Sequence, residues 1–134
     1  MMKTLQYAGA IIDEFERHAV TDVMNKGWFG LGVKGQEFEQ SLSNFIGMKG
    51  AVLTNSGSSA NLLALTSLEL PIGSEVITCV LGFPTTINPI IQNGLVPVFV
   101  DCDETLNIDY RKLKKALSPK TRAIIFAAHP KTIK

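Results

Sequence analysis

The sequence predicts an α/β fold in which a mostly parallel sheet is covered by helices on both faces. After residue 50, four short β-rich runs alternate with stretches of helical periodicity. The runs are apolar almost throughout, as parallel strands buried on both faces are, whereas an antiparallel sheet with one solvated face would alternate. Right-handed crossovers through the intervening helices then place the strands in one sheet.

The elements follow from the spacing of apolar residues. Strands are expected at residues 51–54, 75–80, 96–100 and 122–127, and helices at 8–25, 36–46, 58–70, 85–92 and 110–117. The first helix is indicated by apolar side chains at three- and four-residue steps, namely Ile11, Ile12, Phe15, Ala19 and Val23. Gly27 and Gly47 are expected to end the first two helices. Two parts follow, an amino-terminal helical segment at 1–48 and an incomplete α/β domain at 49–134.

Composition excludes several classes of partner. The chain has 134 residues, 46% of them hydrophobic, with a net charge of +1. Such a charge provides no strong attraction for nucleic acid or an anionic membrane, and no apolar run approaches the roughly 20 residues that span a bilayer. The two cysteines, Cys79 and Cys102, lack metal-binding spacing and fit small core residues of a reduced, cytoplasmic protein.

The segment 54–61, between the first expected strand and its helix, is a candidate phosphate site. Gly57 permits a tight turn, and the amides of Ser58 and Ser59 would be unsatisfied donors at a helix amino terminus. The segment lacks the Gly-Lys-Ser/Thr of a Walker A loop and the GxGxxG of a dinucleotide site. The alternative interpretation is simple helix capping by Ser56 or Ser58.

A second candidate follows the strand at 75–80. Phe83 should emerge at the same sheet edge as the phosphate segment, because ligands of open α/β sheets collect at the carboxyl ends of the strands. Thr85 and Thr86 are expected to cap the next helix. Phe83 alone fits ordinary packing as well as ring stacking. Together the two segments favour a phosphorylated heteroaromatic ligand.

Eight separated segments give the chain a specific resemblance to a known family. They are GW near residue 27, FE at 38, TNSGSSANLLAL at 54, GSEVIT at 73, GFPTT at 82, NPIIQNGLVPVFVD at 88, NID at 107 and TRAII at 121. From Tyr7 to Ile125 this order resembles the DegT/DnrJ/EryC1/StrS family of sugar aminotransferases and dehydratases, which have the aspartate-aminotransferase (fold type I) large domain. The segments GFPTT and IIQNGLVPVFVD are most similar to the CDP-4-dehydro-6-deoxyglucose 3-dehydratase branch, which serves lipopolysaccharide biosynthesis.

The resemblance implies a cofactor, a substrate and an assembly. Gly57, Ser58 and Ser59 would hold the phosphate of pyridoxal phosphate or pyridoxamine phosphate, and Phe83 would stack on its ring. Trp28 would approach a nucleotide-sugar substrate, either in its own subunit or from the neighbouring subunit of a homodimer. Packing of Trp28 against the first helix is the alternative. No catalytic and no metal-binding residue is assigned within this chain.

The departures from the family predict a partial protein. The acid that pairs with the pyridine nitrogen, and the catalytic lysine or histidine, would lie beyond residue 134. Cys79 and Cys102 do not match the iron–sulfur cysteines of some dehydratases. His129 stands one place late and without the usual glycine, as a frameshift or truncation would produce. The segment from Leu65 to Gly73 is shorter than in many dehydratases.

Three hypotheses about the chain therefore stand beside one another. The first is an inactive amino-terminal piece of a sugar dehydratase or aminotransferase. The second is a self-sufficient module that binds a phosphate ligand, and the third is a fragment that pairs with a separately encoded carboxyl-terminal half. The acids Asp101, Asp103 and Glu104 follow a strand, and are expected to cap and solvate a turn. Lys112, Lys114 and Lys115 are expected to face solvent near a helix end.

Overall fold

The computed structural model describes residues 9–128, which fall in two compact units divided between Leu53 and Thr54. Tyr7, where the resemblance begins, and His129 lie outside the described residues. No helix within the described range is long and apolar enough to cross a membrane.

The first unit contains two helices, α1 (Glu14–Lys26) and α2 (Val33–Ile46). A capping box starts α1: the Asp13 carboxylate accepts a hydrogen bond from the Phe15 amide (2.9 Å), and the Glu16 carboxylate accepts one from the Asp13 amide (2.8 Å). The cap places Ile11 and Ile12 before the helix, so the expected start at residue 8 was wrong. Both helices end at left-handed glycines, Gly27 (φ 66°) and Gly47 (φ 68°), as predicted.

Residues 51–54 form no strand, which corrects the expectation from their apolar character. A strand needs a partner for its backbone groups, and here the Leu53 amide donates to the Glu39 carboxylate on α2 instead (2.6 Å). The sheet of the second unit therefore has three strands and not four.

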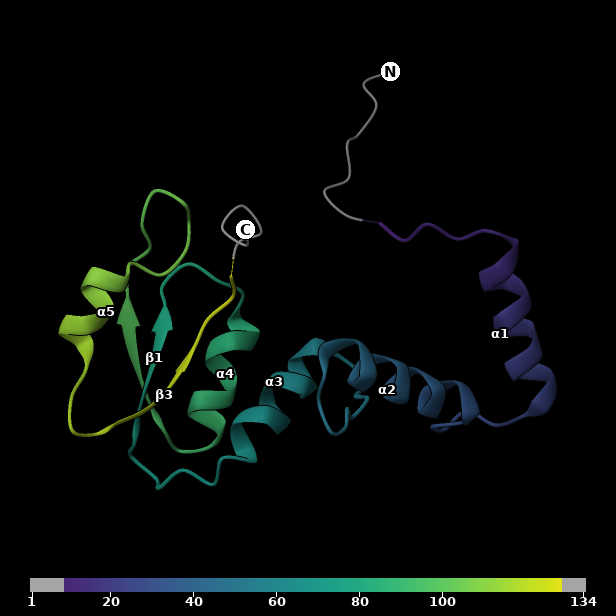
Figure 1. Ribbon diagram of the computed structural model, residues 1–134, viewed down its shortest axis with the longest axis horizontal. Helices are drawn as coiled ribbons and strands as arrows, with labels where there is room; N and C mark the ends of the chain where they lie inside the picture. The colour runs from purple at the N-terminus through teal and green to yellow at the C-terminus, as the bar shows by residue number, and fades with distance from the viewer. Residues whose placement is uncertain (1–8, 129–134) are drawn as a thin grey trace, which may run out of the picture. The chain divides into compact units, whose positions relative to one another are not determined.

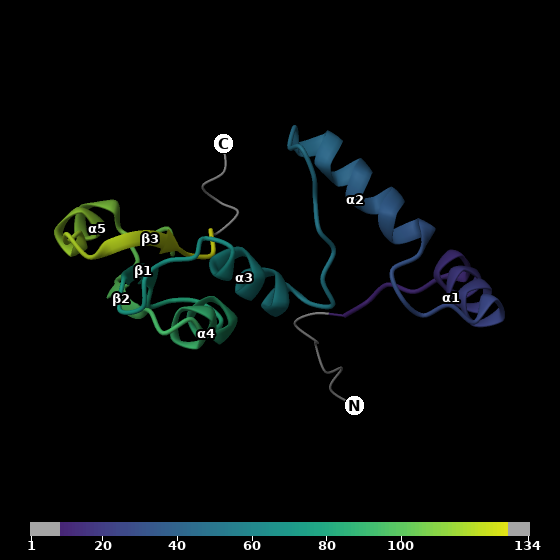
Figure 2. The ribbon, with the colours of Figure 1, turned by 90° about the horizontal axis from the view of Figure 1, so that it is seen from below.

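The second unit is an α/β layer structure with the order α3 (Gly57–Thr66), β1 (Glu75–Cys79), α4 (Pro84–Gln92), β2 (Val96–Val100), α5 (Tyr110–Ala116) and β3 (Thr121–Ile125). All strands run parallel in the order β2-β1-β3 (Figure 1). The chain passes from β1 to its neighbour β2 and then crosses back over β1 to reach β3. The two connections therefore run in opposite directions across the sheet. Right-handed crossovers then put α4 and α5 on opposite faces, as Figure 2 shows. The predicted fold class is confirmed.

Helix α3 is shorter than predicted because the chain turns after Thr66. The amides of Leu68 and Glu69 donate to carbonyls three residues earlier, and Glu69 adopts a positive φ of 47°. Pro71 follows two residues later and has no amide hydrogen to continue a helix. This turn leads the chain into β1.

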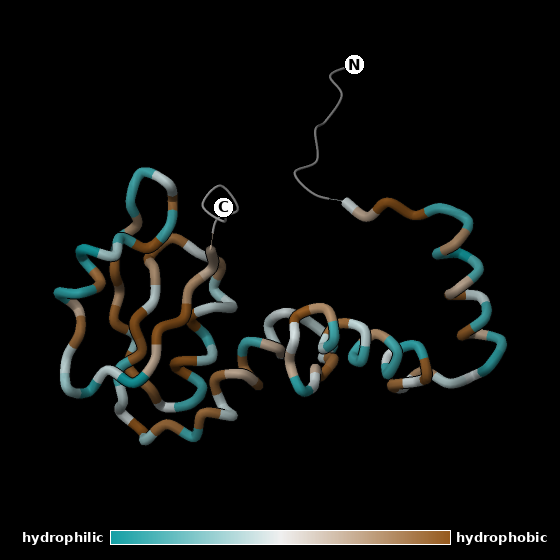
Figure 3. The backbone as a smooth tube through the Cα atoms, viewed as in Figure 1, coloured by the Kyte–Doolittle hydropathy of each residue, from teal (hydrophilic) through white to brown (hydrophobic). Residues whose placement is uncertain are grey.

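The core lies between the sheet and the α3–α4 layer. Its buried cluster is Leu65, Val76, Ile90 and Leu95, with Leu70, Ala123 and Ile125 packed around it. Apolar residues follow the strands in Figure 3, in agreement with a sheet covered on two faces. Cys79 is buried in β1 and Cys102 is half-buried, and both thiols are free.

One polar group in this core lacks a partner. Thr78 is fully buried in β1, and within the described part of the chain its Oγ1 is a buried side-chain atom with no hydrogen bond. A buried, unsatisfied hydroxyl costs about 1–3 kcal/mol. Thr78→Val should therefore raise the free energy of unfolding by about 1 kcal/mol, measured by urea denaturation.

The control for this prediction is Thr66→Val. The Thr66 hydroxyl donates to Asn93 Oδ1 (3.0 Å), so its loss removes a real hydrogen bond and should lower stability. A Thr78→Val variant that is less stable than the parent would show that the Thr78 hydroxyl is satisfied.

Candidate functional site

The amino terminus of α3 carries free backbone donors. Ser56 is the N-cap residue, and its Oγ accepts a hydrogen bond from the Ser59 amide (3.2 Å). The Ala60 amide makes the first helical bond, to the Ser56 carbonyl (3.0 Å). Among residues 9–128 nothing accepts from the amides of Gly57 and Ser58. Two amides therefore remain available at the positive end of the helix.

This geometry bears on both interpretations of the segment 54–61, a phosphate site and simple helix capping. Capping is performed by Ser56, as one alternative held, and it uses the Ser59 amide. The Ser59 hydroxyl is also engaged, because it donates to Asn55 Oδ1 (2.6 Å). A Cβ built at Gly57 would meet no atom within 4 Å, so the α carbon of Gly57 borders open space. The phosphate interpretation now depends on Gly57 and Ser58 more than on Ser59.

The second candidate segment starts α4. Phe83 is the N-cap residue, with no side-chain cap, and Pro84 takes the first helical position, where its missing amide hydrogen costs nothing. Thr85 and Thr86 thus lie inside the first turn, and the expectation that they cap the helix was wrong. The Phe83 side chain is 73% exposed. An exposed aromatic ring at this turn is available to a ligand.

The first turns of α3 and α4 lie beside each other. The Asn61 side chain of α3 donates to the Thr85 carbonyl of α4 (3.3 Å). A cavity of about 240 Å³ opens between the helices and is lined by Ser58, Ser59 and Leu62 from α3 and by Thr85, Asn88 and Gln92 from α4. Phe83 is not among its lining residues, although it stands two positions before Thr85. The structure therefore brings the two predicted segments together at Ser58 and Thr85.

Trp28 belongs to the first unit and lies in its own glycine-rich loop. Its indole Nε1 donates to the Leu31 carbonyl (3.3 Å). Added Cβ atoms at Gly30 and Gly32 would lie 3.7 and 3.4 Å from the Trp28 ring, at ordinary van der Waals distance. The ring remains largely exposed. Its approach to a substrate stays a prediction.

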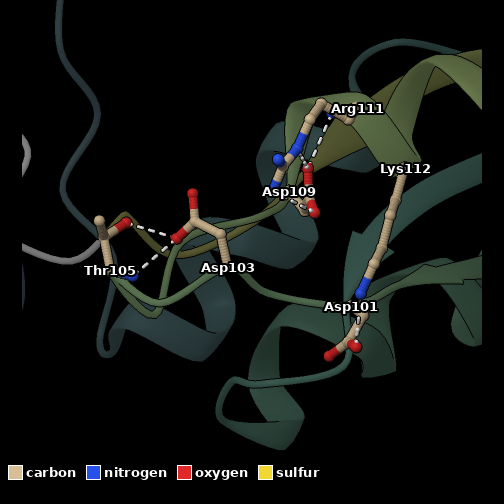
Figure 4. A network of polar contacts seen from close by, with 6 residues as sticks. All are labelled: Asp101, Asp103, Thr105, Asp109, Arg111 and Lys112. Carbon is tan, nitrogen blue, oxygen red and sulfur yellow. Dashed lines mark hydrogen bonds and ion pairs between the residues drawn. The ribbon is translucent and has the colours of Figure 1, made fainter.

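The loop between β2 and α5 holds a polar network that sequence analysis recognised only in part (Figure 4). Asp101 pairs with Lys112 (2.8 Å), so that lysine is not merely solvated. Asp103 accepts from the Thr105 amide (2.8 Å) and hydroxyl (2.6 Å), which closes the turn as expected. The part of the chain that the structure describes contains no cluster of acids, histidines or cysteines suited to a metal.

Asp109 is the member of this network that sequence analysis missed. It is only 5% exposed, accepts from the Arg111 amide (2.9 Å) as N-cap of α5, and pairs with the Arg111 guanidinium (3.1 Å). The signal was present, since an aspartate directly before YRKLKK is a preferred N-cap. Arg111 holds the pKa of this carboxyl below its ordinary value of 3.8, and Lys112 does the same for the pKa of Asp101.

Comparison with known proteins assigns the family. The sequence profile of the DegT/DnrJ/EryC1/StrS aminotransferase family matches residues 10–129. The chain belongs to this family. The predicted resemblance is thereby confirmed.

The relatives include dehydratases and an aminotransferase. The chain is 46% identical over 129 residues to the dTDP-4-dehydro-2,6-dideoxy-D-glucose 3-dehydratase of Saccharopolyspora spinosa. The match covers 90% of the chain and 28% of that relative. The chain is 42% identical over 102 residues to the dTDP-4-amino-4,6-dideoxy-D-glucose transaminase of Escherichia coli, covering 75% of the chain and 27% of that relative. The chain therefore spans less than a third of the length of these relatives.

Solved structures of the family share the fold. The E. coli GDP-4-keto-6-deoxy-D-mannose-3-dehydratase with bound hydrated PLP superimposes with a TM-score of 0.84 at 35% identity, over 92% of this chain and 34% of that one. The PLP form of the putative sugar aminotransferase Spr1654 from Streptococcus pneumoniae gives 0.84 at 32% identity, over 91% and 31%. The predicted fold, part of a fold-type I large domain, is confirmed.

The Asp109 ion pair gives a pH prediction. Because the folded-state pKa of Asp109 is depressed, the stability it contributes is present above the ordinary pKa of 3.8 and is lost as pH falls through the folded value. Asn can still cap α5, so Asp109→Asn should remove only the ion pair. The variant should be less stable near neutrality, and its free energy of unfolding should fall less than the parent's between about pH 5 and pH 2.

Urea denaturation across that pH range checks this expectation. Asp22→Asn is the matched control, since Asp22 lies on α1 and makes no ion pair among the described residues. Parallel pH curves for the parent and Asp109→Asn would contradict the assigned role of Arg111.

Proposed function

We propose that this chain supplies the phosphate and ring contacts for pyridoxal phosphate or pyridoxamine phosphate in an enzyme that removes the 3-hydroxyl group of a nucleotide-linked 4-keto-6-deoxysugar. The observation that carries the proposal is the pair of amides at Gly57 and Ser58, which lie at a helix amino terminus and donate to no group among the described residues. A phosphate dianion fits such a site by charge and by hydrogen bonding.

The residues present fit the cofactor. Backbone amides of Gly57 and Ser58 would donate to phosphate oxygens, and the Ser58 hydroxyl, at the border of the cavity with Thr85, would add a further donor. Phe83, exposed at the start of α4, would cover one face of a planar ring. Asn61, bonded to the Thr85 carbonyl, fixes the spacing of the two helix ends. These groups bind and orient, and none of them needs to transfer a proton.

The cofactor, when bound, supplies an electron sink for chemistry at the sugar carbons next to its attachment. The substrate class is proposed from relatives: two 3-dehydratases, from S. spinosa and Yersinia pseudotuberculosis, are 46% and 36% identical. The Salmonella typhimurium lipopolysaccharide biosynthesis protein RfbH, at 45% identity, supports a role in polysaccharide biosynthesis. Trp28 would approach the nucleotide-sugar, and the whole protein would be a cytoplasmic homodimer.

A sugar aminotransferase is the second candidate. The E. coli transaminase relative supports it at 42% identity, and so does the Spr1654 structure. The family resemblance places the catalytic lysine or histidine outside this chain, so by itself the chain should bind cofactor without turning over substrate. The hypothesis of a self-sufficient module that only binds a phosphate ligand would use the same amides, those of Gly57 and Ser58.

Deleting one donor tests the phosphate site. Ser56 is extended (φ −165°, ψ 159°), as a residue before proline should be, and proline is tolerated at the first helical position. Gly57→Pro should therefore keep α3 and lose one amide donor. Affinity for inorganic phosphate and for pyridoxamine phosphate should fall about tenfold, as expected for one hydrogen bond to a charged group.

Calorimetry measures the affinity of each variant for inorganic phosphate and for pyridoxamine phosphate. Val33→Pro is the matched control, because Val33 is the first residue of α2 and also follows an extended cap, Gly32 (φ −109°, ψ −171°). It should bind both ligands like the parent. Unchanged affinity in Gly57→Pro, with the parent binding, would place the anion elsewhere.

Trimming the aromatic ring tests the second contact. Phe83→Leu should weaken pyridoxamine phosphate about threefold to tenfold, the range of an aromatic pair worth about 1 kcal/mol, and should leave inorganic phosphate unaffected. Phe45→Leu, which shortens an exposed phenylalanine on α2, is the control. An equal loss for both ligands in Phe83→Leu would mean that Phe83 supports the loop and does not contact the ring.

A further inference from the structure

Helix α4 contains a proline in its interior. Pro89 is fully buried and has no amide hydrogen, so the carbonyl of Thr85, one helical turn earlier, loses the hydrogen bond that an α-helix would give it. Proline is the least favourable residue inside a helix for this reason. Backbone carbonyls away from water need a partner. The Thr85 carbonyl therefore needs a donor from outside α4.

The donor comes from α3. The Asn61 side-chain amide donates to the Thr85 carbonyl (3.3 Å), and it thus occupies the acceptor that Pro89 leaves open. Asn61 follows Ser58 by about one helical turn, and Thr85 follows Phe83 by two residues. The bond therefore joins the two helices directly behind both proposed ligand contacts.

A second polar contact joins the same helices at their other ends. The Thr66 hydroxyl donates to Asn93 Oδ1 (3.0 Å), and Asn93 Nδ2 donates to the Pro89 carbonyl (2.8 Å). Thr66 lies about 12 Å along α3 from Ser58 at the helical rise per residue. The helices thus have one polar contact beside the candidate site and another remote from it.

We propose that Asn61, acting through the carbonyl that Pro89 leaves free, is a positioning residue that makes the site select phosphates carrying a ring over phosphate alone. The inference rests on the proposed function. The amides of Gly57 and Ser58 belong to α3, so inorganic phosphate needs no particular placement of α4. A ligand with a phosphate and a ring at a fixed separation also needs Phe83 at the matching distance, which the Asn61 bond sets.

Comparing two ligands tests this role in the full chain. Asn61→Leu keeps a side chain of similar size and removes the donor. By calorimetry it should weaken pyridoxamine phosphate about threefold to tenfold, as Phe83→Leu does, and leave the affinity for inorganic phosphate unchanged. The double variant with Asn61→Leu and Phe83→Leu should lose no more affinity than Phe83→Leu alone, because both changes remove the same ring contact.

Thr66→Val is the matched control. It removes the remote interhelix bond to Asn93 and should lower stability, as Asn61→Leu does. It should leave the affinity for both ligands unchanged. A general loosening of the two helices would instead make Thr66→Val and Asn61→Leu behave alike toward pyridoxamine phosphate.

A urea double-mutant cycle tests the hydrogen bond without any ligand. Pro89→Ala restores a backbone amide that can donate to the Thr85 carbonyl within α4. Asn61→Leu should lower the urea midpoint of the parent, and should lower that of the Pro89→Ala variant by no more than about half as much, because the carbonyl then keeps a partner. Circular dichroism verifies that Pro89→Ala retains its helices. The ligand comparison does not use this variant.

Four results with the ligands would overturn the proposal. They are an equal loss of affinity for both ligands in Asn61→Leu, no loss for pyridoxamine phosphate, a loss that adds to that of Phe83→Leu, and the same loss in Thr66→Val. An equal drop of the urea midpoint in both backgrounds would overturn the link through the Thr85 carbonyl.

These failures differ from failure of the proposed function. A parent that binds neither ligand would overturn the proposed function and the selectivity together, and the urea cycle would still report on the Asn61 bond. A parent that binds both ligands, with Asn61→Leu unchanged, would overturn only the role of Asn61.

Discussion

The packing of β1 against the α3–α4 layer is the constraint on which the second unit depends. Val76 and Ile77 are fully buried in this central strand, and Val76 contacts the cluster that joins Leu65 of α3 to Ile90 of α4. That cluster sets the distance between two helices, and the Asn61 bond to the Thr85 carbonyl fixes their first turns. The candidate site inherits its geometry from these contacts, because its donors are backbone groups at the helix ends.

The strands of the sheet were predictable because each is a short apolar run bounded by turn or polar residues. Residues 96–100 form β2 at the expected bounds, between a turn at Gly94 and the acids that follow. Residues 51–54 have the same apolar character and yet make no strand, since pairing depends on residues far away in the sequence. Apolar composition identifies segments able to pair, whereas the partner decides whether they do.

The details of the site were harder to predict than its location. Sequence analysis placed the helix amino termini at Ser58 and Thr85, and both helices begin one residue earlier, at Gly57 and Pro84. It did not distinguish amides used by a cap from free ones, because that depends on whether Ser56 turns its hydroxyl toward Ser59. Thr85 and Thr86 resemble caps in sequence, but Pro84 is suited to the first helical position and shifts the cap to Phe83.

The proposed site would divide binding from reaction choice. The two free amides would bind the phosphate and the exposed aromatic ring would cover the cofactor ring. Neither contact would touch the sugar carbons, so both would serve a dehydration and an amino transfer equally. Relatives named as 3-dehydratase and as transaminase are 46% and 42% identical to the chain, so the aligned region is similar in both kinds of enzyme. In such a protein the residues between 54 and 92 determine cofactor affinity. The outcome of the reaction would then depend on groups outside these residues.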